Sequence, residues 1–117
     1  MEAKKIDLGS VHVHKKVIIE IIHRTLAEIK GIHLAEVPFW KKIFSFLNKE
    51  DAPGIMIMVN EESSISLSIR ILVQYGVSIV QIAHKIQDLV RADIEKSLEV
   101  NIKDINVDVQ GIERSGR

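Results

Sequence analysis

The segment SISLSIRILV, residues 64–73, is the clearest structural signal in the chain. Successive side chains of a β-strand point to opposite faces, so a strict alternation of apolar and polar residues predicts a half-buried strand. Its apolar face consists of Ile65, Leu67, Ile69, Ile71 and Val73. The preceding segment Gly54–Asn60 (GIMIMVN) is also rich in β-formers, and Glu61–Ser64 (EESS) is typical of a turn. These two segments are therefore predicted to form a β-hairpin.

A long helix is predicted after this hairpin. Gly76 interrupts the strand, and Ser78 with Gln81 three residues later fits a capping box. Apolar residues then recur at spacings of three and four, which predicts an amphipathic helix with one face in a core: Ile79, Ile82, Ala83, Ile86, Leu89, Val90, Ile94 and Leu98. Ile105–Ile112 (INVDVQGI) alternates again and predicts another strand with one apolar face.

The N-terminal half shows a similar order. Val11–His14 (VHVH) predicts a short strand, and Lys16–Lys30 predicts an Ile-rich helix that ends at Gly31. Ile32–Val37 predicts a further strand. The sequence thus predicts one α+β domain over residues 1–117, with the order β-α-β-(short α)-β-β-α-β. We expect a mixed β-sheet whose alternating apolar positions are covered by the two long helices.

A short amphipathic helix is predicted over Pro38–Asp51 (PFWKKIFSFLNKED), which holds four of the five aromatic residues. At 100° per residue its apolar side chains share one arc and its lysines the other. Packing within its own domain is the favoured interpretation, while docking to a partner and direct lipid binding stay open. The predicted docking residues are Phe39, Trp40, Lys41, Lys42, Phe44, Phe46 and Lys49.

Composition limits the function classes. The chain has 16 basic and 16 acidic residues, so no overall charge favours a nucleic acid as its main partner. It has no cysteine, which excludes disulfides, thiolate metal sites and cysteine nucleophiles. The N-terminus lacks the apolar core of a signal peptide, and no apolar run approaches the roughly 20 residues of a membrane-spanning helix. We expect a cytoplasmic protein whose contact with a membrane is peripheral or made through a partner.

Conventional catalytic motifs are missing from the sequence: there is no phosphate-binding glycine loop, no HExxH and no GxSxG. The histidines give one weak metal hypothesis. If Val11–His14 is a strand, His12 and His14 point to the same side, and His33 joins them if its strand is adjacent. An exposed sheet face is the favoured interpretation of these imidazoles. No cofactor and no enzymatic activity are predicted.

Two alternative functions remain open at this point. An α+β domain of this size invites comparison with KH and RRM modules, but the GXXG loop and the sheet aromatics of those modules are missing. An RNA-binding or regulatory module would therefore depend on a local basic patch, for which the signal is weak. A small-molecule or metal-binding domain would need a closed apolar pocket or the three histidines brought together.

The region Ile71–Ile112 resembles the alkaline shock protein family, also called the envelope stress response family, of mostly Gram-positive bacteria. The resemblance is carried by Gln74-Tyr75-Gly76 at the end of a strand, by Ile86-Gln87, Val90 and Ile94-Glu95 along the helix, and by Ile102, Ile105-Asn106-Val107, Val109 and Gly111-Ile112. The opening GSVHVHKKVIIEIIHRTLAEIKGI is also similar to the start of that family. The resemblance implies a small cytoplasmic protein without known enzymatic activity. It further implies self-association and attachment to the membrane through a membrane-anchored protein partner.

Overall fold

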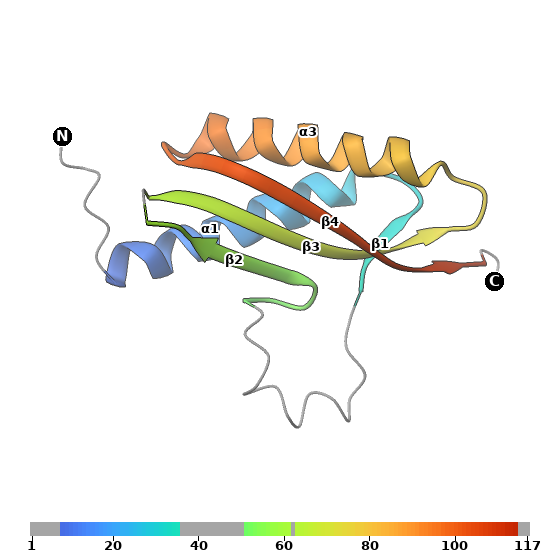
Figure 1. The fold of residues 1–117 in the computed structure, drawn as a ribbon, viewed down its shortest axis with the longest axis horizontal. Helices are drawn as coiled ribbons and strands as arrows, with labels where there is room; N and C mark the ends of the chain where they lie inside the picture. Colours follow the sequence, from blue (N-terminus) through green and yellow to red (C-terminus); the bar gives the residue numbers. More distant parts are fainter. Residues whose placement is uncertain (1–7, 36–50, 62, 115–117) are drawn as a thin grey trace, which may run out of the picture.

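The computed structural model describes residues 8–35, 51–61 and 63–114 (Figure 1). Its helices and strands follow one another as α1 (Leu8–Ala27), β1 (Ile32–Leu34), β2 (Ile55–Val59), β3 (Ser64–Gln74), α3 (Ile79–Ser97) and β4 (Asn101–Glu113). Two helices with a four-stranded sheet make an α+β fold, as predicted.

Strand β3 is the centre of the sheet, because every other described strand pairs with it. On one side β4 runs parallel to β3 along its whole length, from Ser64↔Asn101 to Gln74↔Glu113. On the other side β2 and β1 are antiparallel to β3 and follow one another along it, β2 against residues 65–69 and β1 against residues 71–73. The sheet is therefore mixed, and the predicted hairpin of β2 and β3 is confirmed.

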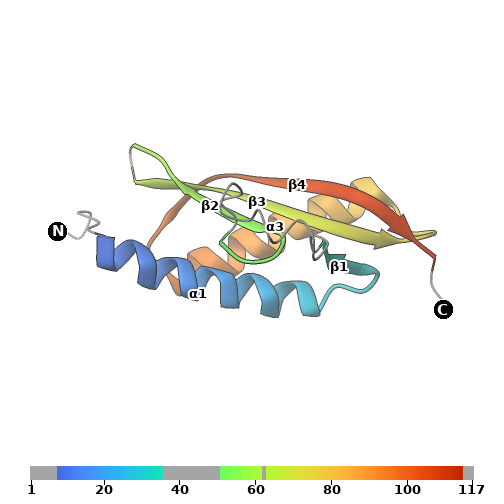
Figure 2. The same cartoon turned by 90° about the horizontal axis from the view of Figure 1, so that it is seen from below.

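Both helices lie on the same face of the sheet (Figure 2). They bring the apolar residues of their helical stripes against the alternating apolar positions of the strands. The buried apolar side chains are Ile18, Ile21, Ile22 and Leu26 from α1, Ile86, Val90 and Ile94 from α3, Ile32, Ile55, Ile57, Ile65, Leu67, Ile69, Ile71, Val73, Ile102 and Ile105 from the strands, and Ile29 and Ala35 beside β1. The opposite face of the sheet carries polar residues, among them Ser66, Ser68, Asn106 and Asp108.

Local signals fix the two ends of α3. Ser78 is the N-cap, and its side-chain oxygen accepts a 3.3 Å hydrogen bond from the backbone N–H of Gln81, which confirms the predicted cap. At the other end the N–H of Leu98 donates to the carbonyl of Ile94 at 2.8 Å. The helix stops there because Leu98 has an extended backbone.

The predicted strand Val11–His14 is wrong, because these residues belong to helix α1. Four alternating residues are a weak strand signal, and they immediately precede a long helical stripe. Extending a helix costs much less free energy than nucleating one, so the segment continues the helix rather than pairing as a strand. The described order is therefore α-β-β-β-α-β, and the predicted first strand does not exist.

Several predicted bounds also shift. Helix α1 ends at Ala27 rather than Lys30, through tight turns from Glu28 N–H to Thr25 and from Ile29 N–H to Leu26. Gly31 follows with a φ of 89°, in the left-handed region that favours glycine. β4 begins at Asn101, four residues before the predicted start.

Candidate docking surface

Large apolar side chains are exposed where β3 turns into α3. Tyr75 is 70% exposed, Val80 66%, Ile112 57% and Ile79 39%. We call these four residues the apolar end. An exposed apolar cluster bordered by polar groups is typical of a protein–protein contact, and aromatic anchors are favoured at such contacts. This cluster is the candidate functional surface of the described residues.

The turn after β3 positions Tyr75 and the start of α3. Tyr75 follows the last residue of β3, and Gly76 reverses the chain with a φ of 98°. Ser78 then caps α3, so that Ile79 and Val80 are its first two residues. Because Val80 lies outside the stripe that meets the sheet, its side chain faces away from the core.

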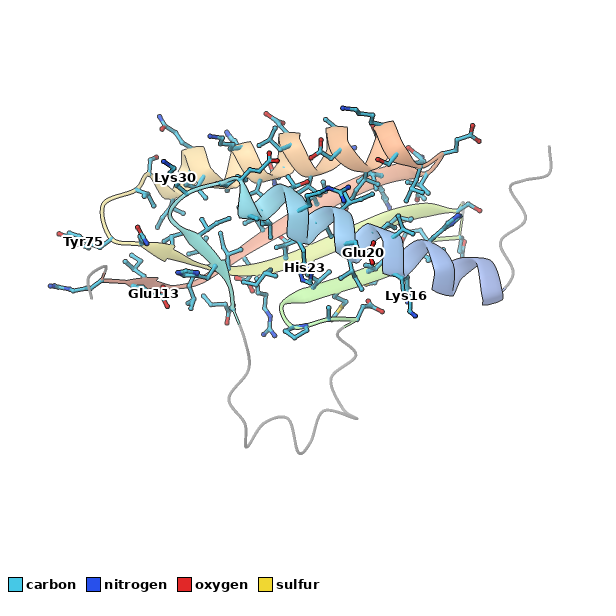
Figure 3. The ribbon with its side chains drawn as sticks, turned by 180° about the vertical axis from the view of Figure 1, so that it is seen from behind. Lys16, Glu20, His23, Lys30, Tyr75 and Glu113 are labelled. Carbon is cyan, nitrogen blue, oxygen red and sulfur yellow. The ribbon has the colours of Figure 1, made fainter. Side chains whose placement is uncertain are left out.

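The end of β4 joins the turn to form one surface. The backbone N–H of Tyr75 donates a 2.7 Å hydrogen bond to the carbonyl of Glu113, and Ile112 is paired with Val73. The guanidinium carbon of Arg114 lies 5.5 Å from the centre of the Tyr75 ring, which is the geometry of a cation–π contact. Tyr75 and Glu113 lie at the same end of the molecule (Figure 3).

Two charged residues of opposite sign border the apolar end. His33 Nε2 on β1 lies 3.3 Å from Glu113 Oε1, so this carboxylate has a partner across the sheet when the imidazole is protonated. Arg114 is held over Tyr75. Among the described residues, this border therefore combines one acidic group, one basic group and the imidazole of His33.

The metal hypothesis loses its geometric basis. His12 and His14 belong to helix α1 and not to a strand. They therefore do not share a strand face, and the side chain of His12 lies outside the described ones. His33 is on β1, beside Glu113. Among the described residues no group of three or more His, Asp or Glu side chains could hold a metal ion.

Residues 38–50 of the predicted aromatic helix lie outside the described residues. All seven predicted docking residues are in this part: Phe39, Trp40, Lys41, Lys42, Phe44, Phe46 and Lys49. Packing within the domain, docking to a partner and direct lipid binding therefore remain predictions for this segment. Its last residue, Asp51, is described and forms a 3.2 Å ion pair with Lys15 on α1.

Sequence reasoning missed the apolar end, although part of its signal was present. Val80 lies off the apolar stripe of its helix, which is a recognisable sign of an exposed apolar side chain. The helical spacing predicts Ile79 in the core stripe, but it is 39% exposed because α3 begins beyond the covered part of the sheet. Ile112 follows a register shift between Val109 and Gly111 that the alternation of the strand does not reveal.

Two polar hollows occur elsewhere on the described surface. One of about 450 Å³ is lined by Asn60, Glu61, Ser64, Asn101 and Lys103. The other, of about 260 Å³, lies between the helices and is lined by Arg24, Glu28, Asp93, Lys96 and Ser97. Both linings combine acidic, basic and neutral polar groups, so neither indicates one class of ligand.

Neither helix of the described chain is long and apolar enough to cross a membrane. Comparison with known proteins gives a match over residues 3–114 to the model of the alkaline shock protein 23 family, described as having a cell envelope-related function. An uncharacterised protein of Streptococcus pyogenes serotype M6, Spy1535, is 26% identical over 106 residues, which cover 90% of this chain and 80% of that protein. No solved structure gives a significant match.

Proposed function

This chain belongs to the alkaline shock protein 23 family, which has a cell envelope-related function, and we propose that it acts there as a non-enzymatic scaffold. In this proposal the protein stays in the cytoplasm, associates with further copies of itself, and docks on a membrane-associated protein partner. The docking contact is the apolar end. The exposure of its four large apolar side chains on one end of the fold is the observation that carries the proposal.

The chemistry of the apolar end favours a protein partner over a lipid surface. Tyr75 combines a large apolar ring with a polar hydroxyl, and tyrosine and arginine are among the residue types that most often anchor protein contacts. A peripheral lipid-binding surface instead combines apolar residues with clustered lysines and arginines, which attract anionic headgroups. Arg114 and Glu113 offset one another at this border.

Co-sedimentation with membranes tests the proposal. The purified full chain is mixed with membranes from a Gram-positive bacterium that carries this family, with the same membranes after protease treatment, and with protein-free vesicles containing anionic lipid. The test variant is Val80→Lys/Ile112→Lys, which places two charges on the apolar end. The control is Met58→Lys on β2, where the side chain is 53% exposed, close to the exposures of Val80 and Ile112.

Met58 is a suitable control because it lies far from the apolar end. It is paired with Ser66, eight residues along β3 from Gln74, so the separation is about 26 Å at about 3.3 Å per residue. We expect the wild type and Met58→Lys to sediment with untreated membranes and Val80→Lys/Ile112→Lys to remain in solution. The wild type should remain in solution when it is mixed with the protease-treated membranes. Equal sedimentation of all three proteins, or binding of the wild type to protein-free vesicles, would contradict docking on a protein.

A further inference from the structure

Strand β4 is an edge strand of 13 residues, from Asn101 to Glu113. It pairs with β3 on one side, and no described strand pairs with it on the other. An open edge of this length presents a row of backbone N–H and C=O groups that another strand can bind.

Hydrogen bonds around β3 identify the residues whose backbone faces outward. The N–H of Arg70 donates to Gly54 and its carbonyl accepts from Ala35, so even-numbered residues of β3 bond toward β1 and β2. Odd-numbered residues of β3 therefore bond toward β4. In a parallel pair they bond to the residues that flank their partner, and Leu67 is partnered with Ile105. Hence the backbone groups of Asp104, Asn106 and Asp108 bond to β3. The backbone groups of Ile105, Val107 and Val109 lie on the outer edge.

Helix α3 covers only the first part of this edge. Arg91 donates a 2.7 Å hydrogen bond to the carbonyl of Ile102, and Gln87 donates one of 2.9 Å to the carbonyl of Ile105. These contacts agree with the outward direction of those carbonyls. Among the described side chains, no hydrogen bond of this kind reaches Val107 or Val109, so the described residues leave the edge open beyond Ile105.

We propose that the open edge of β4 binds the β4 edge of a second copy of this chain, antiparallel and centred on Val107. On the helix face, this register sets Val107 opposite the second copy's Val107 and Ile105 opposite its Val109. On the other face it sets Asn106 opposite Asp108. Apolar pairs on one face and amide–carboxylate pairs on the other are both favourable across antiparallel strands.

Charge selects this register over its neighbours. In the register centred on Asn106, Asp104 of each copy lies opposite Asp108 of the other. In the register centred on Asp108, the two Asp108 side chains lie opposite one another. Like charges directly opposite are destabilising, whereas the Val107-centred register opposes no two carboxylates between 104 and 110. The carbonyl of Ile105 has a second lone pair, so Gln87 need not leave when the second copy binds.

The inference rests on the self-association proposed above and names its contact. The docking residues Val80 and Ile112 lie outside the central pairing of 105–109, so the two proposals can fail separately. Sedimentation equilibrium of the purified full chain tests the contact. Asn106→Asp replaces both amide–carboxylate pairs by pairs of carboxylates, and Asn106→Asp/Asp108→Asn restores the complementary pairs with the two residues exchanged. Gln81→Glu, an exposed residue of α3, is the control for one added negative charge.

We expect a wild-type dimer that Asn106→Asp weakens by about tenfold, with the exchange variant and Gln81→Glu close to the wild type. A wild type that remains monomeric up to about 1 mM would overturn the self-association itself. A dimer that Asn106→Asp does not weaken, or that the exchange variant does not restore, would overturn only the contact.

A cross-link provides a second measurement that does not depend on charge. The chain has no cysteine, so Val107→Cys introduces a single thiol. At the centre of the proposed pairing its Cα lies about 5.5 Å from the same atom of the second copy, within the range of a disulfide. Mild oxidation should therefore yield a covalent dimer with Val107→Cys and much less with Val59→Cys on β2. Equal yields from the two variants would contradict the Val107-centred register.

Discussion

Thr25 Oγ1 donates a 2.6 Å hydrogen bond to Asp93 Oδ2 and so joins helix α1 to helix α3. Thr25 is only 3% exposed, and it is one of two buried polar residues in the described chain. This bond lies beside the apolar contact of the two helices and fixes how they sit relative to one another. Without this hydrogen bond, the carboxylate of Asp93 would stay half-buried between the helices and lack its Thr25 donor.

Thr25→Val should lower the free energy of unfolding by about 1–3 kcal/mol, because the valine keeps the shape but cannot donate to the carboxylate. Urea denaturation measures the change. A double-mutant cycle with Asp93→Ala isolates the pair, and the expected coupling is about 1 kcal/mol or more. Additive effects of the two substitutions would show that the bond does not contribute to stability.

Ser78→Ala should lower the free energy of unfolding by about 1 kcal/mol, because it removes the acceptor for the N–H of Gln81 at the start of α3. Ser97→Ala, at the last residue of the same helix, provides the control and should change stability by less than about 0.5 kcal/mol. Thermal unfolding of the three proteins measures both effects. A loss of similar size for both serines would indicate a general sensitivity of the helix rather than a cap.

Gly31→Ala should destabilise the fold more than Gly76→Ala. Both glycines have a positive φ, 89° and 98°, so an alanine is strained at either position. At Gly31 the added Cβ would also lie 3.1 Å from Cγ1 of Val77, whereas at Gly76 no atom lies within 4 Å. Denaturation in urea should therefore show a loss of about 1 kcal/mol for Gly76→Ala and a larger one for Gly31→Ala.

Val77→Ala should remove the additional part of the Gly31→Ala effect, since it removes the crowding atom. The expected result is that Gly31→Ala costs no more in a Val77→Ala background than Gly76→Ala costs in the wild type. If the extra loss persists in that background, the crowding at Val77 is not its cause.

Trp40→Ala/Phe44→Ala should lower the free energy of unfolding by several kcal/mol, because packing within the domain is the favoured interpretation of the aromatic segment. Denaturation measures the stability, and membrane co-sedimentation is measured on the same protein. Unchanged stability together with lost co-sedimentation would instead make this segment part of the docking contact, in addition to the apolar end.

The parts of the fold with long periodic patterns were predictable from the sequence. The alternation of residues 64–73 and the spacing after Ser78 both carry the burial that the structure shows. The four-residue alternation of Val11–His14 misled because so short a pattern fits a helix as well as a strand. The wrong strand then brought His12 and His14 together on a face that does not exist.

The docking surfaces were harder to predict, since they depend on where one element ends relative to another. Val80 and Ile112 are exposed because α3 and β4 extend beyond the covered part of the sheet. Whether the backbone N–H and C=O of Val107 lie on the outer edge depends on the register of β4 against β3. Neither relationship is encoded in the pattern of a single segment.

Each of the other described strands pairs with β3, so no pair of described strands would remain bonded if β3 were released. Partial opening of the sheet by release of β3 would detach β1, β2 and β4 together. The amide hydrogens that bond β3 to β2 and β4 should therefore show one common free energy of opening, equal to that of global unfolding, while the short strand β1 is the only one of the three described partners small enough to fray by itself.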